Sequence, residues 1–181
     1  MVKTAEKIPF SELSLVKLEE RHELSKFDCI LNGEDKEAQE FLQTTALKYQ
    51  NMNMAVTYLC RYKNDIVGFI TICTNSVEFD WKQIENLDEK IRHKEVPALK
   101  IAWLGTHKDF RKRDIGKFMV FSAVDLALLL SSTIGIRIIT LDTREDLISY
   151  YQKLGFRIIN KETKEKEHPV MYFDLMKDSI I

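Results

Sequence analysis

Apolar residues in the first half of the chain alternate in some stretches and recur with a longer period in another. The runs AVTYLCRY (55–62) and DIVGFITICT (65–74) are rich in β-branched and aromatic residues, and only Lys63 and Asn64 separate them. This pattern predicts a hairpin of two antiparallel strands. Residues 10–20 alternate loosely and predict a first strand.

A helix is expected between the first strand and the hairpin. Asn32-Gly33 predicts a turn, since both residue types favour turn conformations. A helix then runs from about Asp35 to Tyr49, because apolar residues return at helical spacing. These apolar residues are Ala38, Phe41, Leu42 and Ala46.

A strand–helix–strand unit occupies the centre of the second half. ALKIAWLGT (98–106) predicts a strand, DIGKFMVFSAVDLALLLSST (114–133) an apolar helix that begins at Asp114 or Ile115, and GIRIITLDT (135–143) a buried strand. EDLISYYQKLG predicts a further helix that Gly155 ends as a C-terminal cap. Two closing strands, FRIIN and PVMYFDLM, stand on either side of a charged turn, KETKEKEH.

The order of these elements defines a fold class. A charged segment (77–96) is expected to hold a short helix before Pro97. The whole series predicts an α/β (α+β) fold with a mixed, mostly antiparallel central sheet and helices on both faces. We expect the 181 residues to form a single domain, residues 1–181, which is long enough to bury a core without metal or disulfide staples.

Composition narrows the function classes. The 27 Lys and Arg residues nearly balance 28 Asp and Glu residues, which gives no general reason to expect nucleic-acid or membrane binding. Three cysteines without a CxxC pair indicate a reducing, cytoplasmic setting, and neither they nor the scattered histidines suggest a metal site. Cys60 and Cys73 lie in apolar runs and are expected to be core residues. The stretch MVKTAEKIPF lacks the apolar core of a signal peptide, and the longest apolar stretch, VDLALLLSSTIGI, is expected to be too short to span a membrane.

The stretch FRKRDIGKF (110–118) concentrates cations where the strand gives way to the apolar helix. Unpaired backbone N–H groups and the positive end of the helix dipole favour an anion there, most simply a phosphate. Gly116 would let the backbone approach such a ligand closely. Charge alone leaves a solvated basic loop equally open.

This loop and its surroundings resemble the GNAT N-acetyltransferase superfamily. The motif of this family that binds acetyl-CoA consists of Gln or Arg, two further residues, Gly, one further residue, and then Gly or Ala. It is similar to the stretch LKIAWLGTHKDFRKRDIGKFMVFSAVDLAL. Arg111 matches the first position and Gly116 the last, while Asp114 replaces the first glycine. SYYQKLGFRI resembles the family's FYEKxGF segment, and IGIRIITLDT and MYFDL are also similar. The resemblance covers roughly residues 25–176. Within the superfamily, the layout from LNGEDKEAQEFLQ (31–43) onward resembles the branch that contains the acetyltransferase toxins of toxin–antitoxin pairs.

The resemblance implies which residues bind acetyl-CoA (coenzyme A). Backbone groups near Leu104, Gly105 and Thr106 would pair with the pantetheine arm. The pyrophosphate would meet the loop, whose backbone donors matter more than its side chains, and Lys112 and Arg113 would serve the 3′-phosphate or solvent. Arg144 stands where relatives carry an Asn that contacts the cofactor. The full set implied is Leu104, Gly105, Thr106, Arg111, Lys112, Arg113, Asp114, Ile115, Gly116, Lys117 and Arg144.

The resemblance also implies catalytic roles. Tyr151 aligns with the family tyrosine beside the CoA sulfur, and a phenol is ordinarily protonated below pH ~10, so it can donate to a departing thiolate. The alternative is that Tyr150 and Tyr151 are both core aromatics. Glu78 is a candidate general base, His107 is another, and a water chain could replace both. Glu78 and His107 are otherwise expected to be surface residues.

The implied function is acetyl-CoA-dependent N-acetyl transfer to a primary amine by direct attack on the thioester. The acceptor is a small molecule or a protein amine, or an aminoacyl-tRNA as in the toxin-like branch, and a basic patch of Lys100, Lys108, Arg111, Lys112 and Arg113 would favour the tRNA. A non-catalytic acyl-CoA-binding module is the competing class. The acceptor pocket is expected near residues 79–97 and the N-terminal helix, and a homodimer is the default assembly.

Overall fold

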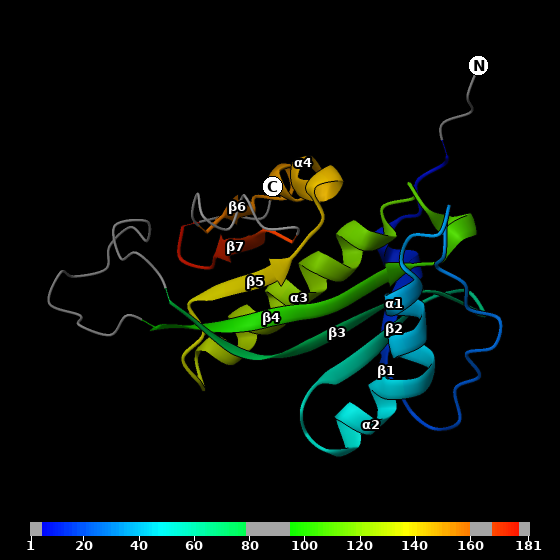
Figure 1. The fold of residues 1–181 in the computed structure, drawn as a ribbon, viewed down its shortest axis with the longest axis horizontal. Helices are drawn as coiled ribbons and strands as arrows, with labels where there is room; N and C mark the ends of the chain where they lie inside the picture. The colour runs from blue at the N-terminus through cyan, green and yellow to red at the C-terminus, as the bar shows by residue number, and fades with distance from the viewer. Residues whose placement is uncertain (1–4, 79–94, 160–167, 178–181) are drawn as a thin grey trace, which may run out of the picture. The chain divides into compact units, whose positions relative to one another are not determined.

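A computed structural model describes residues 5–78, 95–159 and 168–177 (Figure 1). Its elements follow the predicted order. The strands are β1 (Leu13–Lys17), β2 (Val56–Tyr62), β3 (Asp65–Glu78), β4 (Glu95–Thr106), β5 (Ile138–Asp142), β6 (Arg157–Ile158) and β7 (Val170–Asp174). The helices are α1 (Lys36–Glu40), α2 (Ala46–Asn51), α3 (Ile115–Ser131) and α4 (Ile148–Lys153), with a π-helical turn at Phe41–Thr45 and 3-10 turns at Phe10–Glu12, Lys108–Phe110 and Glu145–Leu147.

The described strands form one sheet in the order β1-β2-β3-β4-β5-β7-β6. Four neighbouring pairs, β1–β2, β2–β3, β5–β7 and β6–β7, are antiparallel, and β4–β5 is parallel. The parallel pair follows from the strand–helix–strand unit, since a helical crossover returns the chain in the same direction. The predicted mixed, mostly antiparallel sheet is therefore confirmed.

Most predicted elements are confirmed, with differences at their ends. The hairpin forms as predicted, with Lys63 in the left-handed conformation (φ 55°) that a tight turn needs. The helix from Asp35 forms, but a π-helical turn interrupts it. The strand predicted over residues 98–106 begins earlier, since β4 starts at Glu95 and includes Pro97. The segment in which a short helix was expected (mostly 79–94) and most of the charged turn (160–167) lie outside the described residues.

The described residues divide into two compact units. Of these residues, the first unit contains 5–73 and 102–122, and the second contains 74–78, 95–101, 123–159 and 168–177. None of the helices within the described ranges is both long enough and apolar enough to cross a membrane.

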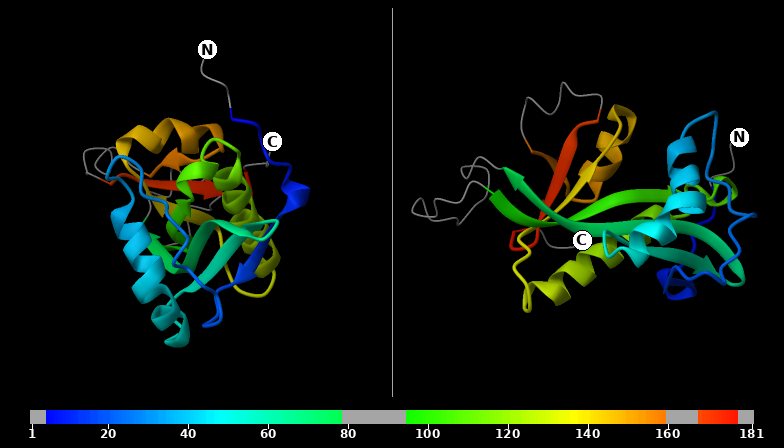
Figure 2. Two further views of the ribbon diagram at one scale, coloured as in Figure 1. Left: turned by 90° about the vertical axis from the view of Figure 1, so that its right-hand side faces the viewer. Right: turned by 60° about the horizontal axis from the view of Figure 1, so that its bottom comes forward.

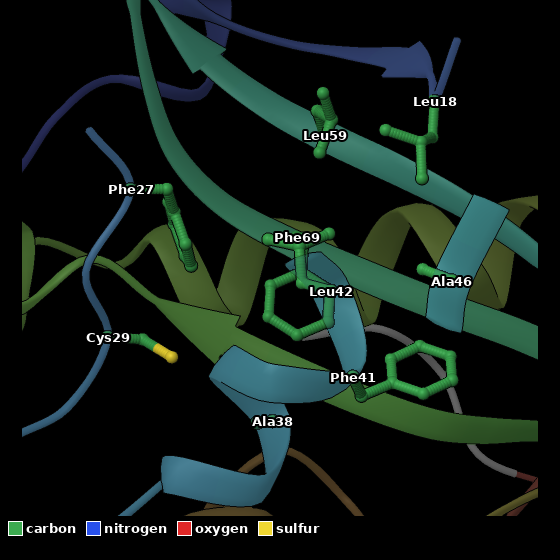
Figure 3. Close-up of a cluster of buried hydrophobic side chains, with 9 residues drawn as sticks. All are labelled: Leu18, Phe27, Cys29, Ala38, Phe41, Leu42, Ala46, Leu59 and Phe69. Carbon is green, nitrogen blue, oxygen red and sulfur yellow. The ribbon is translucent and has the colours of Figure 1, made fainter. Parts of the chain in front are cut away.

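Helices cover both faces of the sheet in the first unit. Successive strand residues point to opposite faces, and Gly68 and Phe69 of β3 show this directly. A Cβ on Gly68 would meet Met119 of α3 at 2.9 Å, whereas Phe69 belongs to a buried cluster with residues of α1 and α2 (Figure 3). The views in Figure 2 show α3 on one face of this part of the sheet and α1 and α2 on the other. The members of this cluster are Leu18, Phe27, Cys29, Ala38, Phe41, Leu42, Ala46, Leu59 and Phe69.

The second unit is built around β5. Ile138, Ile139 and Thr140 are completely buried, as expected for a strand covered on both faces. Arg137 at its start donates from Nη2 to Asp174 Oδ2 at 3.0 Å, and Asp174 is only 1% exposed. A buried carboxylate needs such a partner, so this ion pair ties β5 to the end of β7.

Candidate active site

The loop that leads into α3, taken together with the first two residues of that helix (residues 111–116, hereafter the α3 loop), lies in the first unit. Two of its residues are left-handed: Lys112 has φ 64° and Asp114 has φ 66°. Glycine prefers this conformation, and Asp tolerates it better than most residues do. Asp114 therefore occupies the first glycine position of the motif in the conformation that explains a glycine there.

The backbone of α3 begins directly after Asp114. Phe118 N donates to Asp114 O at 2.9 Å, so the N–H groups of Ile115, Gly116 and Lys117 belong to the first helical turn. These groups have no intrahelical partner and stand at the positive end of a 17-residue helix. The backbone thus provides the donors that an anionic phosphate requires.

The carboxylate of Asp114 points to Lys7. Lys7 Nζ lies 2.5 Å from Asp114 Oδ1, and Ile8 N donates to Arg113 O at 3.2 Å. The N-terminal segment therefore partly neutralises the acidic residue that replaces the motif glycine.

The Arg111 side chain is used inside the first unit. Its Nη2 donates to Cys29 O at 2.7 Å and to Asp35 Oδ2 at 2.5 Å, and it is 25% exposed. Asp35 stands 76 residues earlier in the sequence, and no local pattern links the two residues. Sequence reasoning therefore missed Asp35 as a partner of the loop.

The other cations of the basic stretch differ in their surroundings. Lys112 is exposed, and Lys108 pairs with Asp28 at 2.7 Å. The guanidinium of Arg113 lies over the Phe110 ring at 5.4 Å, and its Nε is buried without a partner among the described residues. Lys117 Nζ lies 5.1 Å from the centre of the Phe121 ring. The stretch is thus largely compensated or packed, unlike a uniformly solvated basic patch.

The end of β4 supplies backbone groups. Residues 98–101 pair with 138–141 of β5, so Leu104, Gly105 and Thr106 come after the last β5 partner. Gly105 is buried, and a Cβ there would lie 2.5 Å from Phe69 Cε1. This stretch of strand can therefore offer main-chain donors and acceptors to an extended ligand.

His107 differs from its predicted place at the surface. Its side chain is 14% exposed and packs edge-on against Phe27 and Phe110, each at 5.7 Å. Its Nδ1 accepts a hydrogen bond from Asp109 N at 3.3 Å. The apolar rings that surround the end of β4 explain its burial, and the expectation of a surface residue was wrong here.

Tyr151 lies in the second unit on α4. Gly155 (φ 94°) ends this helix with two bonds, Gly155 N to Gln152 O and Phe156 N to Tyr151 O, both at 3.0 Å. These bonds form a Schellman motif and confirm the predicted glycine cap. Tyr151 is 7% exposed and Tyr150 is 37% exposed, so the two adjacent tyrosines have different environments.

Aromatic rings surround Tyr151. Its ring centre lies 5.2 Å from that of Tyr150 and 5.8 Å from that of Phe156, both in edge-to-face geometry. Phe156 in turn contacts Phe173 of β7. This packing fixes the phenol ring on a short helix that could not hold it alone.

Arg144 and Glu78 complete the predicted residues. The guanidinium of Arg144 makes two bonds to Asp146, at 3.1 Å and 3.3 Å, and this hydrogen bonding lowers the pKa of the Asp146 carboxyl. Glu78 is exposed at the end of β3, as expected. In the described ranges, no cluster of three His, Cys, Asp or Glu residues could hold a metal ion.

The predicted residues therefore fall into two groups. The first unit holds residues 104–106 together with the α3 loop and Lys117, and the second holds Glu78, Arg144 and Tyr151. The first group has the donors for an anionic, extended cofactor, and the second has a buried phenol.

Comparison with known families agrees with this chemistry. A family model described as an acetyltransferase (GNAT) domain matches residues 53–158, which is more than half of the chain. The chain belongs to this family. It is an N-acetyltransferase that uses acetyl-CoA, as the motif predicted.

Solved structures share the fold. They include AtaT complexed with acetyl-methionyl-tRNAfMet (19% identity, TM-score 0.75, covering 91% of this chain and 95% of that one) and AtaTR bound with AcCoA (20%, 0.73, 92% and 95%). A tyrosine-to-phenylalanine mutant of KacT is also similar (14%, 0.75, 91% and 96%). No curated protein sequence shows significant similarity. AtaT is a toxin, so these neighbours share the fold of the predicted toxin-type branch of the superfamily.

Proposed function

We propose that the acceptor amine attacks the thioester of acetyl-CoA directly and that Tyr151 protonates the departing thiolate. The amine nitrogen bonds to the carbonyl carbon, the C–S bond breaks, and the products are an N-acetyl amide and the CoA thiol. The proton lost by the amine passes to a base or to water, and the Tyr151 phenolate recovers a proton from solvent. The observation that supports Tyr151 as the proton donor is its burial on α4 beside an exposed Tyr150.

We propose that the cofactor binds along the first group of residues. Backbone groups of residues 104–106 would hold the pantetheine arm, and the N–H groups of the α3 loop and of Lys117 would receive the pyrophosphate. A backbone N–H of β4 would stabilise the oxyanion of the transition state. Lys112 is exposed and suits the 3′-phosphate. Arg144, although it is bonded to Asp146, presents a guanidinium that suits a second phosphate contact.

We propose Glu78 as the general base, with a water chain as the alternative. Its exposed position at the end of β3 gives an incoming amine access to the carboxylate. Glu78→Gln should lower kcat/KM most strongly at low pH, where more of the amine is protonated and must lose a proton before attack. An unchanged pH profile would favour water.

We propose an aminoacyl-tRNA as the acceptor. Its support is the likeness in fold to AtaT, which was solved with acetyl-methionyl-tRNAfMet. The predicted basic patch is weaker than its sequence suggests, because Lys100, Lys108 and Arg111 pair with Asp142, Asp28 and Asp35. Side chains that already pair with carboxylates neutralise few tRNA phosphates and so release few counterions. The affinity for tRNA should therefore depend only modestly on salt.

An acceptor screen tests this function. The protein is supplied with acetyl-CoA and with aminoacyl-tRNA, peptide or small amines, and the free thiol is followed. Thiol release with aminoacyl-tRNA is the expected result, and its release only with another amine would replace the acceptor. CoA binding without turnover of any acceptor would instead indicate a non-catalytic module.

We further propose one catalytic domain, a cytoplasmic location and a homodimer. Cys29 and Cys60 are buried thiols, which suits a reducing compartment. Leu128 and Leu129 near the end of α3 are 44% and 71% exposed, and Ile134, which follows the helix, is 48% exposed. Such exposure is unusual for large apolar side chains and suits a contact with a second copy. Sedimentation across a concentration series tests the dimer.

A further inference from the structure

We propose that Asp35 is a positioning residue for the cofactor, which holds the α3 loop in its binding conformation through Arg111. This inference rests on the proposed binding of pyrophosphate by that loop. The contact is short and partly shielded from solvent: Arg111 Nη2 lies 2.5 Å from Asp35 Oδ2, and both side chains are 25% exposed.

Asp35 stands on a well-anchored segment. It precedes α1, and its carbonyl accepts a bond from Gln39 N at 3.0 Å. The Gln39 side chain, 9% exposed, accepts from Cys29 N at 2.9 Å and donates to Phe27 O at 2.6 Å. Cys29 O in turn accepts from Arg111. Both acceptors of the guanidinium are therefore fixed by the same helix.

The α3 loop needs such an anchor. Lys112 and Asp114 are both left-handed, and each such residue costs on the order of 1 kcal/mol. Strained conformations persist only where the surrounding structure determines them. Arg111 fixes the first residue of the loop, and Lys7 and Ile8 contact its other end.

The ion pair between Arg111 and Asp35 also determines what the Arg111 guanidinium can bind. With Asp35 and Cys29 O as its acceptors, the guanidinium is committed to the protein. The pyrophosphate is then left to the backbone donors of the loop, whose direction depends on the loop conformation. Asp35 therefore acts on the cofactor without touching it.

Two acetyl donors distinguish a positioning role of Asp35 from a general effect on stability. Acetyl-CoA carries the pyrophosphate, and S-acetylpantetheine lacks it. In Asp35→Asn, we expect KM for acetyl-CoA and Kd for CoA to rise about tenfold, with kcat and the turnover of S-acetylpantetheine unchanged. Asp35→Glu should recover part of the CoA affinity, since it restores the carboxylate.

Asp28→Asn is the matched control. Asp28 pairs with Lys108 in the same region, but its side chain is 39% exposed, so its loss should leave Kd for CoA within about twofold. Equal losses with both donors, or a CoA affinity in Asp35→Asn that is unchanged or tighter, would overturn the proposal. If the wild-type protein turns over no acceptor, the proposed function fails, while the calorimetric Kd for CoA still decides the role of Asp35.

Discussion

Lys7 Nζ lies 2.5 Å from Asp114 Oδ1, although 107 residues separate the two in sequence. Asp114 is also left-handed, with φ 66°. The residue that departs from the glycine of the acetyl-CoA motif is thus accommodated twice, by a backbone conformation that Asp tolerates and by a cation from the N-terminal segment.

Replacing Asp114 by Gly should leave the affinity for CoA unchanged or increase it. Glycine adopts the same φ without strain and removes a carboxylate from beside the pyrophosphate. The free energy of unfolding should change by less than about 1 kcal/mol. The relief of strain is a gain that offsets two losses, because glycine makes the unfolded chain more flexible and removes a weak, exposed ion pair with Lys7. Asp114→Ala is the control and should lower the free energy of unfolding by about 1 kcal/mol, since alanine tolerates this φ less well than Asp does and also loses the ion pair with Lys7. A large loss of CoA binding in Asp114→Gly would show that the loop is misassigned.

Gly105 should tolerate no side chain. A Cβ would lie 2.5 Å from Cε1 and 3.1 Å from Cδ1 of Phe69, which is completely buried. Gly105→Ala should therefore cost about 1–3 kcal/mol in urea unfolding. Gly135→Ala, where the nearest atom is 3.9 Å away, should be nearly neutral. Adding Phe69→Leu should cost less in Gly105→Ala than in the wild type, and strict additivity would argue against the clash.

Two buried threonines should respond oppositely to loss of their hydroxyls. Thr57 Oγ1 lies 2.8 Å from Thr71 Oγ1, whereas Thr143 Oγ1 has no partner among the described residues. Thr57→Val should lower the free energy of unfolding by about 1–3 kcal/mol, because it leaves the Thr71 hydroxyl without that hydrogen bond. Thr143→Val should be neutral or stabilising. An equal loss in both variants would mean that the Thr143 hydroxyl is bonded in the native protein.

Thiol reactivity should follow burial. Burial raises the pKa of Cys29 to about 11 and that of Cys60 to about 12, from an ordinary value of 9.0. Raised values keep both thiols protonated and unreactive in the folded protein, while the unfolded chain ionises near pH 9.0. Their contribution to stability is therefore complete below pH 9.0 and is lost as pH rises toward 11. Labelling with a disulfide reagent at pH 8 should modify at most Cys73 until denaturant is added, and rapid modification of three thiols would contradict this.

Local sequence signals predicted much of the fold. The hairpin followed from two β-rich runs around Lys63 and Asn64, and the end of α4 followed from Gly155. Each signal acts within a few residues, so a single sequence reveals it. The start of β4 at Glu95 was missed, because a charged segment before a proline does not look like a strand.

The candidate site was predictable in its residues but not in its contacts. The motif indicated Arg111, Gly116 and Tyr151 by spacing. The bond from Arg111 to Asp35 spans 76 residues and depends on the tertiary structure. The burial of His107 depends on Phe27, which approaches it from far away in the sequence.

The most direct test of the account is the kcat of Tyr151→Phe for thiol release from acetyl-CoA. The substitution keeps the packed ring and removes the proton donor, so kcat should fall at least ~100-fold. Kd for CoA should stay within about twofold, and Tyr150→Phe should remain close to the wild type. A Tyr151→Phe protein that retains wild-type kcat would contradict the assignment of Tyr151 as the general acid.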